Sequence, residues 1–269
     1  VTDQIDEAGN GRTRGGAWQP KASFAYTPWL GKPLTFHANY GRAITSTNAR
    51  ALIQDFNSPR VAKTDFYQFG TSHNKGRFSA ATNFFWIDRS NELIYVADDG
   101  SNEFVGPSRN YGFEAKTSVQ LTRFLTYNGS ITKVLNAFYR GTAPREYVDR
   151  APHFTAYSAL TLTSWKGWTG SLRLRSVSRY RLNGEEQDSK GARVPGHTLT
   201  DFSIARQIWK GVEFNLAIDN IFDKRYFETF EMYTSRLRGQ DPLERVHGTP
   251  GYPRTVVAGL TFRLFPKKI

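Results

Sequence analysis

Arginines recur along one short segment at positions that would share a face in a β-strand. The segment WTGSLRLRSVSRYR begins at Trp168, and its odd-numbered positions carry four guanidinium groups. Such a row favours binding of an anionic ligand, such as a phosphate-bearing compound. The alternative is structural, with the arginines paired to carboxylates of other segments, Asp219 and Glu213 among them. The four residues are Arg173, Arg175, Arg179 and Arg181.

A second cluster combines basic and aromatic side chains in the longest predicted loop, residues 223–251. Stacking and charge together would hold an aromatic anionic ligand. The same surface would equally hold anionic lipopolysaccharide. The candidate residues are Arg236, Arg238, Arg245, Phe230 and Tyr233.

No catalytic or metal-binding pattern accompanies these clusters. The chain has no cysteine, and its five histidines lie far apart without metal-ligand spacing. Neither H-E-x-x-H nor G-x-S-x-G occurs. We therefore expect neither an enzyme nor a bound cofactor or metal. The histidines are His37, His73, His153, His197 and His247.

The composition is basic and aromatic rather than aliphatic. Of 269 residues, 14% are aromatic and 39% hydrophobic, and the formal net charge is +12. A charge of this sign suits nucleic acid, an anionic membrane surface or anionic ligands. No run of about 18 apolar residues occurs, which excludes a transmembrane helix. The chain opens at Val1 with a polar stretch and no signal peptide, so we expect a start cut from a longer sequence.

The segments that position these residues alternate with a period of two. In NYGFEAKTSVQL, the residues from Tyr111 to Leu121 at odd positions are mostly apolar, and the even positions are polar. A strand between two different solvents has this pattern. It predicts eleven strands, with residues 91–96 as a candidate extension of the fourth. The strands lie near residues 18–29, 33–45, 63–73, 76–88, 109–121, 123–139, 153–165, 168–181, 197–208, 212–222 and 252–265.

Connections between these strands alternate strictly between tight turns and long loops. Short turns at one end and long loops at the other are typical of an outer-membrane β-barrel. Aromatic residues at both ends fit the girdles of such a barrel. Those beside the short turns are Tyr26, Trp29, Trp165, Trp168 and Trp209, and those beside the long loops are Tyr40, Tyr139, Tyr180, Tyr226 and Tyr252.

Three arginines oppose this interpretation, because they share the apolar phase of their strands. Arg42, Arg206 and Arg254 would face lipid. Each lies near a strand end, where a charge costs about 0–1 kcal/mol, against about 2–4 kcal/mol at the bilayer midplane. The barrel prediction therefore stands.

The strand number indicates how much of a barrel the chain provides. A sheet that spans a membrane must close, and bacterial single-chain barrels have even strand numbers, whereas eleven is odd. We therefore expect an all-β, antiparallel, up-and-down barrel of which this chain is the C-terminal half. Residues 1–17 would be a surface-loop remnant, 18–265 the barrel portion and 266–269 a periplasmic tail. Alone, the strands at 18–29 and 252–265 would have exposed edges prone to aggregation or pairing with another copy.

Three motifs, in this order and spacing, resemble those of TonB-dependent outer-membrane receptors. NYGFEA (110–115) resembles an internal strand start, IDNIFDKRYFE (218–228) the penultimate strand, and HGTPGYPRTVVAGLTFRLF (247–265) the final strand. One departure is that Phe265 is followed by Pro266 and three further residues, whereas family barrels usually end on an aromatic residue. We assign a structural role to the motif residues Asn220, Phe222, Asp223, Lys224, Tyr226, Pro250, Gly251, Pro253, Arg254, Gly259 and Phe265.

The resemblance implies a barrel of about 22 strands and energised uptake of a scarce nutrient in the bacterial outer membrane. Ferric siderophores are the commonest cargo of the family, so we expect one here. The implied partners are outer-membrane lipid, lipopolysaccharide, the barrel-assembly machinery, and the TonB complex through an N-terminal plug and box that these residues lack. Nucleic acid is not expected.

Two other classes of protein compete with this interpretation. A small passive pore or adhesin barrel of about 12 strands would use residues 1–17 as an extra strand, but that segment lacks apolar alternation. A soluble all-β module that binds carbohydrate or nucleic acid would use the positive charge. It would need shorter strands and a real apolar core.

Overall fold

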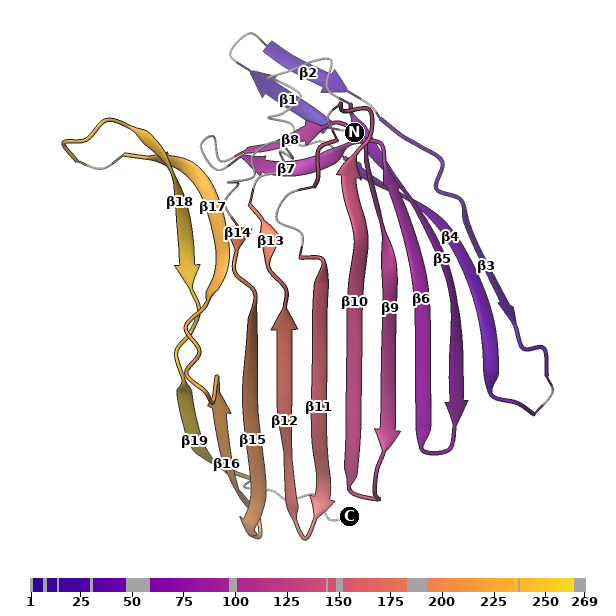
Figure 1. Cartoon of the computed structure of the whole chain (residues 1–269), viewed down its shortest axis with the longest axis vertical. Helices are drawn as coiled ribbons and strands as arrows, with labels where there is room; N and C mark the ends of the chain where they lie inside the picture. The colour runs from indigo at the N-terminus through magenta and orange to yellow at the C-terminus, as the bar shows by residue number, and fades with distance from the viewer. Residues whose placement is uncertain are drawn as a thin grey trace.

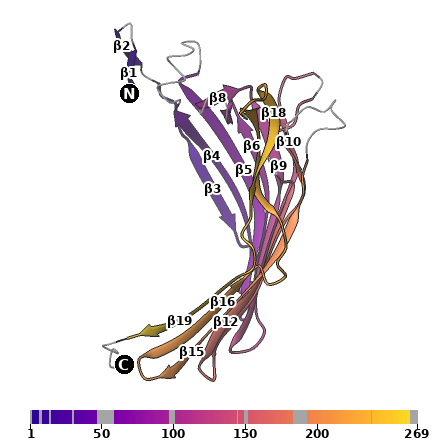
Figure 2. The same cartoon turned by 90° about the vertical axis from the view of Figure 1, so that its left-hand side faces the viewer.

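The computed structural model describes residues 2–6, 9–13, 15–29, 31–46, 59–96, 101–143, 145–148, 152–182, 193–236 and 238–263. Its main feature is one large antiparallel sheet (Figure 1). Seen from the side, the sheet is bent and twisted rather than flat (Figure 2). Within the described ranges, no helix is long and apolar enough to cross a membrane.

The sheet contains eleven strands, and each pairs with its neighbours in chain order. Among the described strands, the first and the last each pair on one side only, so the sheet is open. The strands are β3 (Lys21–Tyr26), β4 (Leu34–Ser46), β5 (Val61–Lys75), β6 (Phe78–Arg89), β9 (Ser108–Gln120), β10 (Leu125–Tyr139), β11 (Phe154–Trp165), β12 (Trp168–Val177), β15 (His197–Trp209), β16 (Val212–Asp219) and β19 (Thr255–Phe262).

The eleven predicted strands are confirmed, and one predicted extension is wrong. Residues 91–96 do not lengthen β6, because Ser90 ends the ladder: its N–H donates to the Lys63 carbonyl, and its hydroxyl accepts from the Lys63 N–H. The chain then turns into a separate hairpin of β7 (Glu92–Val96) and β8 (Ser101–Val105).

The strand predicted over residues 168–181 is also divided. β12 ends at Val177, and β13 (Tyr180–Arg181) pairs with β14 (Arg193–Val194) in a sheet of its own. Gly196 lies so close to this point that an added Cβ would be 2.6 Å from the Val177 carbonyl oxygen. Tyr180 pairs with Val194 in the same register as Val177 with His197, so β13–β14 continues the course of β12 and β15 beyond a break at residues 178–179.

Tight turns occupy one end of the sheet, and the long connections fold at the other end (Figure 1). At the turn between β11 and β12, Lys166 and Gly167 both have positive φ, 49° and 82°. Two such residues form the turn that matches the twist of a hairpin. At the opposite end lie the hairpins β1–β2 (Thr2–Asp6 and Gly9–Thr13), β7–β8 and β17–β18 (Phe227–Ser235 and Leu243–Pro250). The sequence predicts surface loops for these segments, with residues 91–96 as a candidate strand extension, so the three hairpins correct that prediction.

One face of the sheet carries a row of aromatic side chains near the long connections. Tyr40, Tyr67, Trp86 and Tyr111 lie directly opposite one another on β4, β5, β6 and β9. Ring centroids are 5.0 Å apart between Tyr40 and Tyr67, and 5.0 Å between Trp86 and Tyr111. These rings lie on the apolar side of the alternating pattern, the side that also carries Phe113, as expected of an interfacial girdle.

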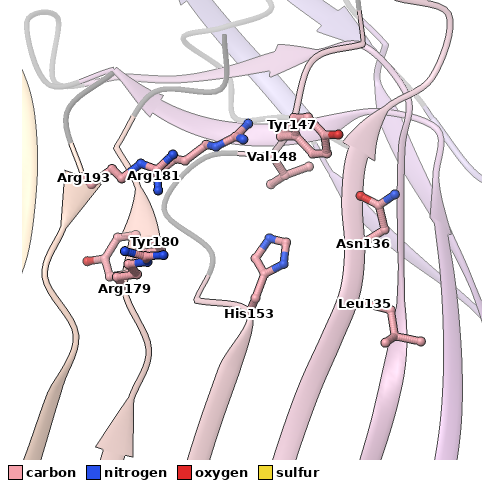
Figure 3. A pocket seen from close by; sticks show the side chains of 9 residues that line it. All are labelled: Leu135, Asn136, Tyr147, Val148, His153, Arg179, Tyr180, Arg181 and Arg193. Atoms are coloured by element: carbon pink, nitrogen blue, oxygen red, sulfur yellow. The ribbon is translucent and has the colours of Figure 1, made fainter. Parts of the chain in front are cut away.

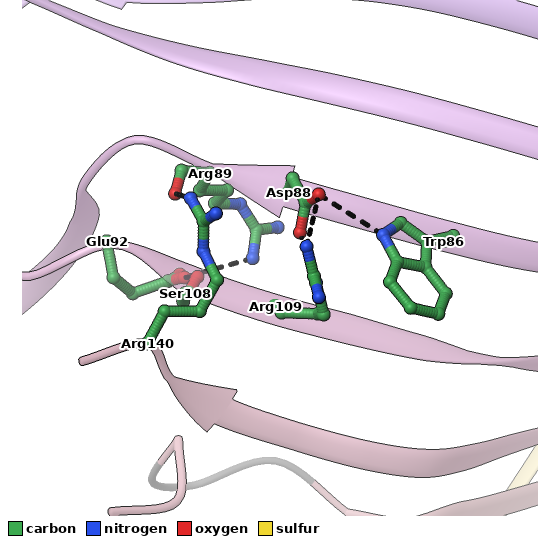
Figure 4. A network of polar contacts seen from close by, with 7 residues as sticks. All are labelled: Trp86, Asp88, Arg89, Glu92, Ser108, Arg109 and Arg140. Carbon is green, nitrogen blue, oxygen red and sulfur yellow. Dashed lines mark hydrogen bonds and ion pairs between the residues drawn. The ribbon is translucent and has the colours of Figure 1, made fainter. Parts of the chain in front are cut away.

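A charged row lies two residues beyond the girdle on the same face. Arg42 contacts Asp65 at 2.8 Å, and Arg109 contacts Asp88 at 2.7 Å. The Trp86 indole N–H also donates to Asp88 at 3.2 Å (Figure 4). The charge of Arg42, which had opposed the barrel prediction, is therefore neutralised by a carboxylate on the next strand.

The other two opposing arginines also have partners. The guanidinium carbon of Arg206 lies 4.9 Å from the centre of the Trp168 ring. Arg254 lies 4.0 Å from Asp223. A paired or ring-stacked arginine keeps its charge at lower cost near the membrane interface.

Candidate functional site

A cavity of about 360 Å³ opens near the long-connection end of the sheet. Two of the four arginines of the row, Arg179 and Arg181, line it (Figure 3). We call it the arginine pocket. Its sides come from β10, the start of β11, the bridge residue beside Phe138, and the short β13–β14 pair. The residues that line it are Leu135, Asn136, Tyr147, Val148, His153, Arg179, Tyr180, Arg181 and Arg193.

Local main-chain geometry directs these side chains into the pocket. Arg181 pairs directly with Arg193 across β13–β14. The buried side chains of Leu182 and Val194, 2% and 3% exposed, anchor that pair. On β10, the register shifts between Val134 and Asn136, which leaves Leu135 as the extra residue of a β-bulge. A bulge changes the direction of its side chain.

The pocket is strongly cationic. Three guanidinium groups line it, and among the described residues none of Arg179, Arg181 and Arg193 forms an ion pair. The Arg181 guanidinium carbon lies 4.7 Å from the centre of the Tyr147 ring. None of the described lining residues is acidic. Such a pocket can bind an anion through charge-assisted hydrogen bonds.

His153 is the titratable group of the pocket. It precedes β11 and is half-buried. Burial lowers its pKa below the ordinary histidine value, and the positive charges of Lys133 and Arg181 lower that pKa further. The imidazole is therefore disposed to be neutral while the pocket holds no anion.

The other two arginines of the row, Arg173 and Arg175, have carboxylate partners. Arg175 contacts Asp201 at 3.0 Å, and Arg173 contacts Asp219 at 3.9 Å. Asp219 was one of the partners named from the sequence. The other, Glu213, instead lies 3.6 Å from Arg263. The row thus divides into a paired half and a half that faces the arginine pocket.

Asn220, in the penultimate-strand motif, organises the end of β16. It is 4% exposed, and its φ is 51°. Its side-chain amide donates to the carbonyls of Lys224 at 2.9 Å and Tyr252 at 3.1 Å, and its side-chain oxygen accepts from the Lys224 N–H at 2.9 Å. One side chain therefore joins two segments that lie 32 positions apart.

The neighbouring motif residues complete the same junction. The Asp223 carboxylate accepts from the Arg254 N–H at 2.9 Å. Gly251 packs so closely on Tyr226 that a Cβ built there would overlap the ring. The motif residues that take part in this junction are therefore Asn220, Asp223, Tyr226, Gly251 and Arg254.

The remaining motif residues have simpler surroundings. Phe222 is 77% exposed, and Gly259 faces the Asn215 side chain. Pro250 lies opposite Phe227 in the β17–β18 ladder, and the Pro253 carbonyl accepts from the Thr255 hydroxyl. Phe265 lies outside the described residues.

The basic and aromatic candidates of the longest loop lie on or beside the β17–β18 hairpin. Tyr233 stacks on His247 with ring centroids 3.6 Å apart, and Phe230 packs on Phe227 at 4.7 Å. Arg245 donates to Gln240 at 3.1 Å. None of the candidates Phe230, Tyr233, Arg236, Arg238 and Arg245 lines the arginine pocket.

Several pocket residues were not singled out from the sequence as a site. Tyr147, Arg193 and Asn136 come from separate segments without a shared spacing, and His153 is one of the five histidines that lie far apart in the sequence. Their convergence depends on the β13–β14 pair and the β-bulge. No group of three or more potential metal-ligating side chains occurs in the described part of the chain.

Comparison with known families decides the relationship that the motifs suggested. The sequence model described as "TonB dependent receptor-like, beta-barrel" matches residues 2–221. The chain belongs to this family. No curated protein matches the chain.

Solved structures share the fold of this receptor barrel at low sequence identity. A mutant of the ferric enterobactin receptor from Pseudomonas aeruginosa has 15% identity and a TM-score of 0.71, and the alignment covers 96% of this chain and 41% of the receptor. The ferric yersiniabactin uptake receptor from Yersinia pestis has 15% identity and a TM-score of 0.73, and the alignment covers 95% of this chain and 39% of that receptor. The copper transporter OprC has 16% identity and a TM-score of 0.68, and the alignment covers 91% of this chain and 39% of the transporter. The chain thus spans about two fifths of the structures it matches.

Proposed function

We propose that the chain is the C-terminal barrel portion of an outer-membrane receptor for energised uptake of a scarce nutrient, and that the nutrient is a ferric siderophore. The proposal rests on the family, the eleven-stranded sheet and the arginine pocket. Two of the similar structures carry names of ferric siderophore receptors, and a third is a copper transporter.

The arginine pocket is the observation that carries the choice of ligand. Many ferric siderophores carry net negative charge, and the three guanidinium groups would meet that charge by bidentate hydrogen bonds. Tyr147 and Tyr180 add aromatic surface for a ligand with aromatic rings. A bare copper ion would be repelled by the same lining.

The rest of the receptor would lie outside these residues. A barrel of about 22 strands would be completed by a preceding sheet, and a plug would provide the contact with TonB. In this arrangement, residues 1–17 belong to a surface loop, 18–265 to the barrel and 266–269 to a periplasmic tail. Outer-membrane lipid, lipopolysaccharide and the barrel-assembly machinery are its other partners, and the bacterial outer membrane is its location.

The proposal is tested by binding and uptake together. The purified protein in detergent is titrated with ferric enterobactin, ferric yersiniabactin and Cu²⁺, and uptake of the bound compound is measured in cells that carry the whole receptor, plug included, with and without TonB. We expect binding of a ferric chelate, with at least about tenfold weaker affinity in the double variant Arg179→Ala/Arg193→Ala. Arg123→Ala, an exposed arginine in the turn before β10, is the matched control.

Two results would overturn the proposal. Binding of Cu²⁺ alone would remove the siderophore assignment. Uptake that does not depend on TonB would favour the alternative function, a small passive outer-membrane pore or adhesin barrel.

A further inference from the structure

His153 shares the arginine pocket with several positively charged side chains. Lys133 of β10 and Arg181 of β13 both act on its imidazole electrostatically. Arg179 and Arg193 line the same cavity. Tyr147 and Tyr180 contribute phenol side chains to the same lining.

An anion in the pocket would reverse the balance at this imidazole. Without an anion, burial and the neighbouring cations hold the pKa of His153 below its ordinary value. A negative charge placed within about 4–6 Å favours the protonated form of a histidine. The occupied pocket would therefore have a higher affinity for one proton than the empty pocket.

Apolar side chains contribute to the lining beside these charged groups. Leu135, the extra residue of the β-bulge, is 49% exposed, and Val148 lies next to Tyr147 (Figure 3). The Asn136 amide and the Tyr147 hydroxyl belong to the same part of the lining. The exposed apolar surface would be covered by a ring or a hydrocarbon part of a ligand. The pocket therefore offers a ligand both cationic and apolar surface.

We propose that the arginine pocket takes an amphipathic ligand with at least two negative charges, and that His153 gains a proton from solvent when this ligand binds. The inference rests on the proposed function, because it uses the same pocket as the ligand site. We expect at least two charges because three guanidinium groups line the pocket and none of its described lining residues is acidic. The only bond that forms is the N–H bond between the imidazole and a proton taken from solvent, and that proton returns to solvent when the ligand leaves.

The test uses a probe whose own charge does not change with pH. Benzene-1,3-disulfonate keeps two negative charges across the range in which histidine titrates, from about pH 5.5 to about pH 8. Binding to the purified protein is measured by titration calorimetry in two buffers with different ionisation enthalpies, which reports the protons taken up. The native protein alone gives this number, so the test does not depend on a variant that folds.

We expect proton uptake of up to one per site, and affinity that rises as pH falls by at most about tenfold per pH unit. His153→Gln should bind the disulfonate without proton uptake and without this pH dependence. His197→Gln removes another half-buried histidine, one that does not line the pocket, and should keep both. Benzenesulfonate, with one charge, should bind at least about tenfold more weakly than the disulfonate.

The outcomes separate this inference from the proposed function. Binding of the disulfonate without proton uptake overturns the role of His153, and equal binding of the monosulfonate overturns the requirement for two charges. If neither sulfonate binds, the anion site itself is wrong. The proposed function is decided by other measurements, the binding of a ferric chelate and its TonB-dependent uptake.

Discussion

Asp201 accepts a hydrogen bond from the main-chain N–H of Asn220 at 3.1 Å, and this bond ties the end of β16 to the middle of β15. Both residues are buried, with 2% and 4% exposure. The same carboxylate accepts from Nε of Arg175 at 3.1 Å. The paired half of the arginine row is thereby connected to the family motif.

Replacing this carboxylate should destabilise the barrel wall. Asp201→Ala leaves the Asn220 N–H without its acceptor and Arg175 without its partner, and we expect a loss of about 1–3 kcal/mol in the free energy of unfolding. Urea unfolding followed by tryptophan fluorescence measures it. Asp219→Ala is the control: that carboxylate is 52% exposed and 3.9 Å from Arg173, so its loss should cost less than about 1 kcal/mol. Equal losses would contradict the assignment.

The close packing of Gly251 on Tyr226 predicts a specific steric defect. Gly251→Ala should impair folding, because the new methyl group would overlap the tyrosine ring. We expect a loss of about 1–3 kcal/mol, measured by the same unfolding experiment. Gly106→Ala should be nearly neutral, because no atom of the described residues, its two chain neighbours apart, lies within 4 Å of the added carbon.

A second substitution checks the cause of that defect. Tyr226→Ala removes the ring, so the double variant Gly251→Ala/Tyr226→Ala should lose less stability than the sum of the two single variants. Simple additivity would show that the ring is not the obstacle.

The ion pair beyond the aromatic girdle should show strong coupling. Asp65→Leu alone leaves the Arg42 charge unpaired on the face that carries the aromatic row and also removes the acceptor of the Tyr40 hydroxyl, 2.8 Å away. The double variant Arg42→Leu/Asp65→Leu removes both charges. A double-mutant cycle should therefore give a coupling energy of about 0.5–3 kcal/mol. A coupling near zero would mean that water, rather than Asp65, solvates Arg42.

His153 should make the ligand-free protein sensitive to acid. Its pKa is lowered in the folded state, so at pH above the ordinary histidine value of about 6.5 the group is neutral in both folded and unfolded chains and does not affect stability. As pH falls below that value, the unfolded chain takes up the proton first, and the folded state loses stability. Thermal unfolding of the native protein and of His153→Gln across this range measures the difference. A steeper acid loss in the variant would contradict the sign.

The sequence predicted the main sheet well because the pattern of alternation has a physical cause that acts on every strand. A strand with lipid on one side and water on the other must alternate along its length, as residues 109–121 do. The segments at 92–96 and 227–250 carry no such constraint. Their hairpins depend on local contacts, such as the bond between Ser90 and Lys63, that a period of two does not reveal.

Of the residues that line the candidate site, the sequence predicted only those that lie along one predicted strand. Arg179 and Arg181 were found because they continue the phase of Arg173 and Arg175. Arg193 and His153 reach the same cavity only through the β13–β14 pair and the entry to β11. The partner of Arg42 could have been found by placing β4 against β5 in register, because Asp65 lies directly opposite.

The odd number of strands in the open sheet also restricts how it can be closed. In an antiparallel series of eleven, β3 and β19 run in the same direction, from the long connections toward the short turns. If a second copy were placed beside this sheet in the same orientation, its edge strands would run in the same direction as β3 and β19. Strands would then pair in parallel at both junctions between the copies. Antiparallel closure instead requires an odd number of additional strands whose outermost members run the other way.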